Sequence, residues 1–442
     1  MGLLDKKYRV LKPTDSYLSD KIVLAQAWKK AQSYIRSTNW YANNFELDQS
    51  TLSLSSNLER WKKELESISY NLTPLRLVPA PKSTKWEFVE SILFPPVNEP
   101  KKTLGQAEAL EGLNQTWQPV KIIEEGTETK ERTVPPLRPL AHVPIKEQTL
   151  FTALMMCLAN HVETMQGDTS TKLDDVHERK IVNYGNRLFC RFINEQAVFP
   201  WGNSTIYSKY FTDYQRFLER PYYFAKQAIE SKIDKENVFE VHLDLKSFYD
   251  YIDREKLTER ITKLIEDFDK EKSPILSYLL SSFESWSWDS NSSKLYEDVC
   301  QKDQETIPMG IPQGLVSGGF FANVYLLDFD EKFADLIGST IADKYRLVDY
   351  SRYVDDMRLV IVSETNESQP IKDELESFID NELKELGLKL NKKKTKVEPF
   401  QLKRTGISQK LKTIQGKVSG PISNSEVDEQ LGHLEGLINL AD

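Results

Sequence analysis

Cysteine and long apolar runs are both scarce in this chain of 442 residues. The three cysteines are an odd number, lie far apart and have no histidine at zinc-site spacing; they are Cys157, Cys190 and Cys300. A disulfide scaffold and a zinc finger are therefore not expected. No stretch reaches the roughly 18 apolar residues that a membrane span needs, and the first residues lack the apolar core of a signal peptide. We expect a soluble, cytoplasmic protein with no membrane partner.

An overall basic charge, which is usual in proteins that bind nucleic acids, is also lacking. The formal net charge is -9, with 58 Lys and Arg against 67 Asp and Glu. The charge is uneven along the chain, because residues 384–417 hold eleven bases and two acids, whereas residues 424–442 hold five acids and no base. This pattern is compatible with a phosphate-binding track on an acidic protein, and equally with a solvated lysine-rich face.

Apolar periodicity and proline spacing divide the chain into helical and extended parts. Helical spacing of apolar residues predicts helices over residues 1–70, 147–162, 323–337 and 374–386, the last closed by Gly387. Short strands are expected over residues 238–243 and 359–362, and the proline-rich stretch 73–136 combines extended segments with a polar loop. Strands that alternate with helices indicate an α/β or α+β core.

Two segments place carboxylates directly at the edge of a predicted strand. Asp244 ends the run VFEVHLD, and Asp355 and Asp356 lie in SRYVDDMRLVIV, a pattern typical of strand, tight turn and strand. Adjacent aspartates between apolar strands are costly unless a cation neutralises them. Three converging carboxylates would supply hard oxygen ligands for two Mg²⁺ ions about 3.5–4 Å apart, which suits attack by a 3′-hydroxyl and departure of pyrophosphate. The alternative is a pair of ordinary turn aspartates, because Asp is common in turns.

The surroundings of these carboxylates resemble the motifs of reverse transcriptases. Four segments resemble motifs A, B, C and D in family order: DLKSFYDYI at 244–252, GIPQGLVS at 310–317, YVDD at 353–356 and GLKLNKKKT at 387–395. Upstream, RPLAHVP at 138–144 and YGNR at 184–187 resemble fingers motifs of group II intron and retron enzymes. Six motifs in order are a far stronger signal than a single YxDD. The resemblance spans residues 136 to 400 and implies an α+β right-hand polymerase, with fingers and an antiparallel palm sheet packed on helices.

The resemblance also implies where the metal ions and the sugar of the incoming nucleotide bind. Asp244, Asp355 and Asp356 match the catalytic residues that bind two Mg²⁺ ions, for which Mn²⁺ can substitute, and the backbone carbonyl of Leu245 is expected to help. Tyr249 matches the steric gate, an aromatic ring that occupies the space of a ribose 2′-hydroxyl.

Further matched residues are implied to bind nucleotide or nucleic acid. Arg138 and Arg187 match fingers cations that hold the triphosphate, a task suited to guanidinium groups. Gln313 is expected to contact the incoming nucleotide, and Lys394 matches a lysine that protonates the departing pyrophosphate. Residues expected to contact nucleic acid within the basic segment are Lys392, Lys393, Lys403 and Arg404. The two fingers arginines could instead be ordinary ion-pair partners, and Tyr249 could be part of the core.

One branch of the family fits best. The segments WYANNFELD at 40–48 and YGNRL at 184–188 look like bacterial defence-associated and abortive-infection reverse transcriptases. This resemblance implies an antiphage role with dNTPs as substrates, a non-coding RNA as template or scaffold, a DNA product and a homo-oligomer. We predict a helical N-terminal extension and fingers entry over 1–135, a reverse-transcriptase fingers and palm core over 136–399, and a short thumb-like segment over 400–442.

Two other functions stay open on the sequence. A catalytically silent RNA-binding scaffold is one, although the intact aspartates and Pro312-Gln313-Gly314 argue against it. An RNA-dependent RNA polymerase is the other, because it shares the palm and its carboxylates. Tyr249 separates the polymerases, since an RNA polymerase needs a residue there that admits the 2′-hydroxyl.

Overall fold

The computed structural model describes residues 6–8, 10–38, 43–81, 86–90, 115–119, 121–125, 129–133, 137–231, 236–266, 268–299 and 307–401. The chain forms two compact units. The first is built from residues 1–74, 143–287 and 308–442, and the second from residues 75–142 and 288–307. The helical N-terminal part therefore shares a unit with the aspartate segments. The predicted borders at 135 and 399 stay a prediction.

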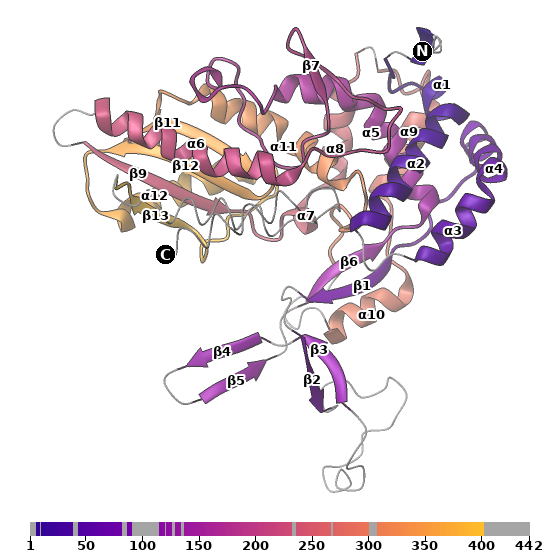
Figure 1. The fold of residues 1–442 in the computed structure, drawn as a ribbon, viewed down its shortest axis with the longest axis horizontal. Helices are drawn as coiled ribbons and strands as arrows, with labels where there is room; N and C mark the ends of the chain where they lie inside the picture. The colour runs from indigo at the N-terminus through magenta and orange to yellow at the C-terminus, as the bar shows by residue number, and fades with distance from the viewer. Residues whose placement is uncertain are drawn as a thin grey trace, which may run out of the picture. The chain divides into compact units, whose positions relative to one another are not determined.

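The first unit is centred on a five-stranded antiparallel sheet (Figure 1). Its strands, in spatial order, are β10 (Thr340–Ile341), β11 (Tyr345–Tyr353), β12 (Asp356–Ser363), β9 (Asn237–Asp244) and β13 (Lys396–Pro399). Both β9 and β12 are rich in apolar residues and are buried along most of their length. Such strands need cover on both faces. The strands predicted at 238–243 and 359–362, and the antiparallel sheet itself, are confirmed.

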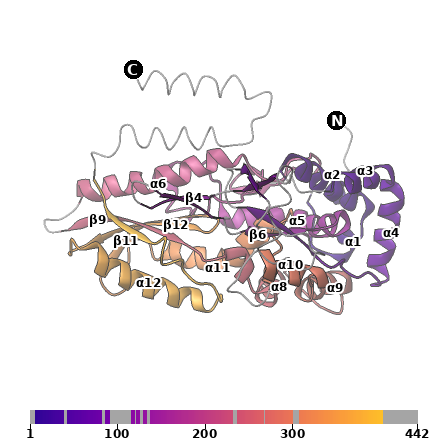
Figure 2. The same cartoon turned by 90° about the horizontal axis from the view of Figure 1, so that it is seen from below.

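Helices cover both faces of this sheet (Figure 2). One face carries α6 (Tyr210–Ser231), and the other carries α11 (Gly318–Asp335) and α12 (Ser368–Lys384). Ala225 of α6 shares a buried cluster with Val360 of β12. On the opposite face the rings of Phe333 and Tyr350 lie with centroids 4.9 Å apart. The helices predicted over 323–337 and 374–386 are confirmed with earlier starts, and Gly387 follows α12 with a φ of 68°, as a helix-ending glycine does.

The remaining helices described in the first unit come from the N-terminal part and from segments between residues 145 and 284. They are α1 (Asp15–Leu18), α2 (Lys21–Thr38), α3 (Asn44–Leu52), α4 (Leu54–Glu66), α5 (Ile145–Gln166), α7 (Phe248–Tyr251), α8 (Arg254–Lys263) and α9 (Pro274–Glu284). Short elements are η1 (Lys6–Tyr8), η3 (Leu173–Asp175) and the hairpin of β7 (Arg191–Ile193) and β8 (Gln196–Val198). Buried Lys30 of α2 donates to the Thr205 carbonyl at 2.6 Å and so fixes α2 to the 200–205 loop. The helical N-terminal part and the buried helix over 147–162 are confirmed.

The second unit pairs β1 (Arg76–Pro81) with β6 (Leu137–His142) and adds α10 (Ser290–Val299). The Leu77 amide donates to the Ser292 hydroxyl at 2.8 Å, which joins two segments that are far apart in the sequence. Two further hairpins pair β2 (Trp86–Glu90) with β3 (Gln115–Pro119) and β4 (Lys121–Glu125) with β5 (Thr129–Thr133). The extended segments predicted in the proline-rich stretch are thus present.

Two further observations concern membrane-spanning helices and the state of the cysteines. Among the described residues no helix is long and apolar enough to cross a membrane. Cys157 and Cys190 are free thiols, and Cys300 lies outside the described residues.

Candidate active site

The register of two strands brings the three aspartates together. Asp356, the first residue of β12, lies directly opposite Asp244, the last residue of β9. Tyr353 pairs with Asp356 across the β11–β12 hairpin, so Val354 and Asp355 form its two-residue turn. The Leu245 amide donates to the Asp355 carbonyl at 3.0 Å and fixes this turn against the end of β9. The convergence expected from the sequence is therefore present, while metal binding by these residues stays a prediction.

The YGNR segment, residues 184–187, packs against this hairpin turn. A Cβ on Gly185 would lie 2.3 Å from the Val354 nitrogen, so only glycine permits the close approach of the two backbones. The Tyr184 amide donates to the Arg352 carbonyl at 2.9 Å, which continues the contact along β11. Val354 itself has a φ of 59°, a conformation that a β-branched residue rarely adopts and that the surrounding structure must impose.

The three carboxylates repel one another in a half-buried setting. Burial raises the pKa of Asp355 to about 6, and the charges of Asp356 and Asp244 add to the rise. Burial also raises the pKa of Asp356, where Asp244 opposes ionisation and Arg358 favours it. Such mutual repulsion indicates a cluster with too little positive charge of its own. A divalent cation held by carboxylate oxygens would supply that charge.

A lysine and an asparagine already contact one of these carboxylates. Lys394 Nζ lies 2.7 Å from Asp244 Oδ2, and Asn391 Nδ2 donates to Asp244 Oδ1 at 2.9 Å. Within the described part of the chain, no three His, Cys, Asp or Glu side chains form a ready-made metal cluster. The ammonium of Lys394 compensates part of the negative charge of the aspartates. The contact of Asn391 with Asp244 was not predicted. Its position in GLKLNKKKT, three residues before Lys394, was the only sequence signal for it.

Motif A and motif B pack against each other beside the aspartates. The Tyr249 hydroxyl accepts a hydrogen bond from Asn186 Nδ2 at 2.9 Å, a second contact that was not predicted. A Cβ on Gly310 would lie 1.9 Å from the Tyr249 carbonyl oxygen, so this glycine is required for the packing. Gln313 Nε2 donates to Asp250 Oδ1 at 2.8 Å. Tyr249 and Gln313 are both half-buried and are held by neighbouring polar groups, which fixes their orientation.

The structure places Arg187 among buried polar groups. Its side chain is buried, and Nε lies 2.8 Å from Glu163 Oε2 in an ion pair with both partners almost fully enclosed. The same guanidinium donates to the carbonyls of Asn183, at 2.8 Å, and Gly167. A guanidinium used in this way cannot also hold a triphosphate without leaving Glu163 buried and uncompensated. In this structure Arg187 anchors the YGNR segment, and the triphosphate role stays a prediction.

Of the five other residues predicted to contact nucleotide or nucleic acid in the fingers and the basic segment, the structure describes three. Exposed Arg138 lies on β6 in the second unit. Lys392 forms an ion pair with Asp380 at 3.0 Å, and Lys393 is exposed. The two remaining residues, Lys403 and Arg404, lie outside the described residues.

Comparison with protein families finds one family that matches the part of the chain containing this site. Residues 185–409 match the family described as reverse transcriptase (RNA-dependent DNA polymerase), which covers just over half of the chain. The chain belongs to this family. The predicted enzyme class, an RNA-directed DNA polymerase and hence a nucleotidyltransferase, is confirmed by this match. Reverse transcriptase domains use divalent metal ions, in agreement with the carboxylate chemistry of the site.

Solved structures that resemble this reverse transcriptase include two of telomerase from Candida tropicalis. The apo enzyme truncated from its C-terminal domain is 14% identical, with 66% of this chain and 51% of that chain covered and a TM-score of 0.31. The complex with the TWJ fragment of telomeric RNA is 13% identical, with 64% and 41% covered and a TM-score of 0.33. The chain thus spans about half or less of those proteins. No curated protein matches it.

Proposed function

We propose that the chain copies RNA into DNA by adding dNTPs to a 3′-hydroxyl, with Asp244, Asp355 and Asp356 as the catalytic residues. One observation carries this proposal: the β9–β12 register sets Asp356 opposite Asp244, beside a turn that presents Asp355. In a turn of ordinary function, three acidic groups would not be brought together on strands that are otherwise apolar. The family match supplies the reaction class.

The donor set fits two Mg²⁺ ions. Carboxylate oxygens are the preferred ligands of Mg²⁺, and the raised pKa values of Asp355 and Asp356 indicate that the cluster lacks cationic charge. The Leu245 carbonyl lies in the same segment as Asp244 and is proposed as a further ligand. When bound, the metal ions would lower the pKa of the attacking hydroxyl and stabilise the departing pyrophosphate.

Other residues of the chain are proposed to contact the pyrophosphate, the incoming nucleotide and the nucleic acid. Lys394 holds a proton at Nζ beside Asp244, and this ammonium is suited to donate that proton to the departing pyrophosphate. Tyr249 is proposed to lie beneath the incoming sugar, where its ring, held by Asn186, would exclude a 2′-hydroxyl. Arg138 and Gln313 are proposed to contact the nucleotide. The lysine-rich stretch with Lys392, Lys393, Lys403 and Arg404 is proposed to contact nucleic-acid phosphates.

The biological setting proposed is bacterial antiphage defence in the cytoplasm, in partnership with a non-coding RNA. Its support is the resemblance of segments 40–48 and 184–188 to defence-associated reverse transcriptases. The fingers and palm would come from the core, and residues 400–442 would form a short thumb. A homo-oligomer of the chain is proposed as well.

The double substitution Asp355→Asn with Asp356→Asn tests the catalytic assignment, because it removes two charges with almost no change in shape. We expect a folded protein that incorporates no dNTP on a primed RNA template in Mg²⁺. Asp343→Asn, an exposed change in the turn before β11, is the matched control and should retain wild-type incorporation. Incorporation by the double variant at the wild-type rate would exclude the assigned site. Preference of the wild type for ribonucleotides would favour the RNA polymerase alternative.

A further inference from the structure

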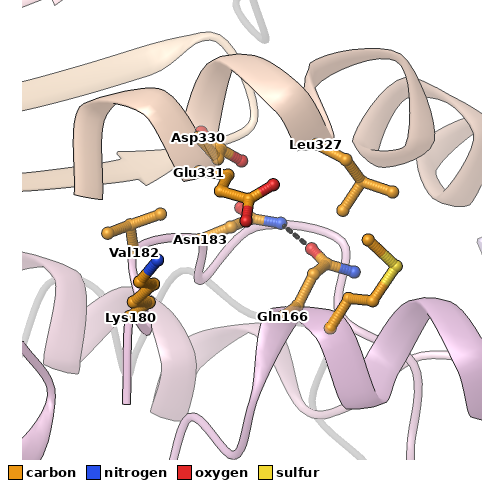
Figure 3. A pocket seen from close by; sticks show the side chains of 8 residues that line it. Gln166, Lys180, Val182, Asn183, Leu327, Asp330 and Glu331 are labelled. Atoms are coloured by element: carbon orange, nitrogen blue, oxygen red, sulfur yellow. Dashed lines mark hydrogen bonds between the residues drawn. The ribbon is translucent and has the colours of Figure 1, made fainter. Parts of the chain in front are cut away.

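A small cavity adjoins the residues that precede the YGNR segment. Its volume is about 180 Å³, and it is bounded by the end of α5, residues 180–183 and α11 (Figure 3). The lining combines apolar side chains with amide, ammonium and carboxylate groups: Met165, Gln166, Lys180, Val182, Asn183, Leu327, Asp330 and Glu331. An engineered cavity of about 150 Å³ accommodates benzene, so a volume of this size has room for one six-membered ring.

The cavity contains a hydrogen-bond donor without an acceptor. Gln166 is 6% exposed, and its Oε1 accepts from Asn183 Nδ2 at 2.6 Å. Its Nε2 has no partner among the described residues. In Figure 3 the Gln166 side chain lies between Asn183 and Leu327, with Nε2 turned away from Asn183. A buried donor that lacks an acceptor is rare because its desolvation is not compensated, and a bound molecule can supply the missing acceptor.

The opposite wall determines what such a molecule must carry. Asp330 is already used by Arg352, at 2.5 Å, and by the Tyr350 hydroxyl, at 2.9 Å. Lys180 is paired with Asp335 at 2.6 Å. The carboxylate of Glu331, on exposed surface, points toward Asn183 and Gln166 in Figure 3 and can accept from a ligand. Two carboxylates on one wall would repel a phosphate group.

We propose that this cavity binds a neutral pyrimidine, as the free base or the nucleoside. A pyrimidine nucleoside carries a carbonyl acceptor and an N–H donor on one edge of its ring, namely O4 and N3–H in uridine, or O2 and the 4-amino group in cytidine. This edge matches the unpartnered Gln166 Nε2 and the Glu331 carboxylate. The apolar side chains of Val182 and Leu327 cover the ring faces. The site is separate from the dNTP site proposed above, and the binding itself does not depend on that proposal.

Both walls of the cavity connect to the turn that carries Asp355. On one side, Asn183 Oδ1 accepts from the Gly185 amide at 3.0 Å, and Gly185 lies directly against Val354. On the other side, the Arg352 guanidinium bound to Asp330 also donates to the Val354 carbonyl at 2.9 Å. A ligand that orders both walls would therefore restrict the Val354 turn as well, which makes the cavity a site for a nucleoside effector.

Titration of cytidine and uridine into the full-length protein by calorimetry tests the binding. The matched variant Gln166→Glu keeps the shape and the acceptor for Asn183 but replaces the unpartnered N–H₂ with an oxygen. We expect binding to weaken about tenfold or more. Leu327→Phe, which fills the cavity, should abolish binding, whereas Leu327→Met should retain it. Exposed Glu331→Gln tests the selectivity, because it should bring the affinity for CMP closer to that for cytidine.

Each outcome decides the proposal. Binding that is equal in the wild type and Leu327→Phe, or that an excess of dCTP with Mg²⁺ removes, would place the nucleoside in the catalytic site and overturn the inference. Absence of binding to the wild type at millimolar nucleoside would also overturn it. The effector role is read independently by hydrogen exchange of residues 350–356, which cytidine should slow in the wild type and leave unchanged in Leu327→Phe. Equal exchange with and without bound cytidine would reduce the cavity to a binding site without an effect on the turn.

Discussion

Replacing Asp355 with asparagine should make the metal-free protein more stable, although it should destroy the proposed activity. An aspartate that serves the fold normally has a lowered pKa, because partners stabilise its charge. Burial and the neighbouring charges of Asp356 and Asp244 instead raise the pKa of Asp355 to about 6 from an ordinary 3.8. The ionised form is thus disfavoured in the folded chain. An asparagine side chain at this position carries no charge and avoids that penalty.

The size of the effect follows from the pKa difference. A pKa shift of one unit corresponds to about 1.4 kcal/mol. The rise from 3.8 to about 6 therefore means that the ionised Asp355 carboxylate destabilises the folded state by about 3 kcal/mol when the pH is above 6. Because the folded-state pKa is the higher one, the folded protein binds the proton more tightly, and stability falls as the pH rises from about 4 to 6. The advantage of Asp355→Asn should therefore be largest near pH 8 and disappear toward pH 4.

Urea unfolding in EDTA, repeated from pH 4 to pH 8, measures this difference. The matched control is Asp349→Asn, a change on the same hairpin. Asp349 is fully buried with Arg220, at 2.7 Å, and His177, and these partners outweigh burial and lower its pKa. Its replacement leaves the Arg220 guanidinium buried without its anionic partner and should cost about 3–5 kcal/mol. If Asp355→Asn also destabilises at pH 8, the carboxylates are structural and the reasoning for a cation site fails.

Three further substitutions test individual roles. Tyr249→Ala should admit ribonucleotides and change the dATP to ATP selectivity by roughly ten- to hundredfold in competition assays, and unchanged selectivity would remove Tyr249 from the gate. Lys394→Gln should lower the Mn²⁺ concentration for half-saturation in metal-binding titrations roughly threefold, since the ammonium on Asp244 competes with the metal, and unchanged binding would contradict this competition. Arg187→Met should destabilise by about 3–5 kcal/mol in urea because Glu163 loses its partner, whereas a weaker dNTP affinity with unchanged stability would support the triphosphate role.

Much of the fold and the aspartate cluster could be predicted because their signals are local. The apolar runs before Asp244 and after Asp356 each define a strand, and the two-residue spacing between Tyr353 and Asp356 defines a tight hairpin. Once both strands lie in one antiparallel sheet, the ends that carry aspartates must meet at the same edge. The exact register, which sets Asp356 opposite Asp244, comes from the structure.

The role of Arg187 could not be predicted in the same way, because motif resemblance does not report burial. Its partner Glu163 is 24 residues upstream, near the end of the apolar helix α5. A glutamate buried in such a helix requires a cation, and this was the available signal. The second unit was missed for a related reason. β1 and β6 pair across more than fifty residues and pack with α10 from a segment near 290–299, so only tertiary structure joins them.

The YGNR segment acquires a single physical explanation when its residues are considered together. Gly185 lets the backbone of the Val354 turn approach, Asn186 holds the Tyr249 hydroxyl, and Arg187 fixes the segment to α5 through Glu163. Each contact positions a different part of the proposed site, yet none of these side chains needs to touch a substrate. A strained turn such as that at Val354 persists only where its surroundings enforce it. These contacts explain how the motif holds the aspartate hairpin in place, whereas its phosphate-binding role stays a prediction.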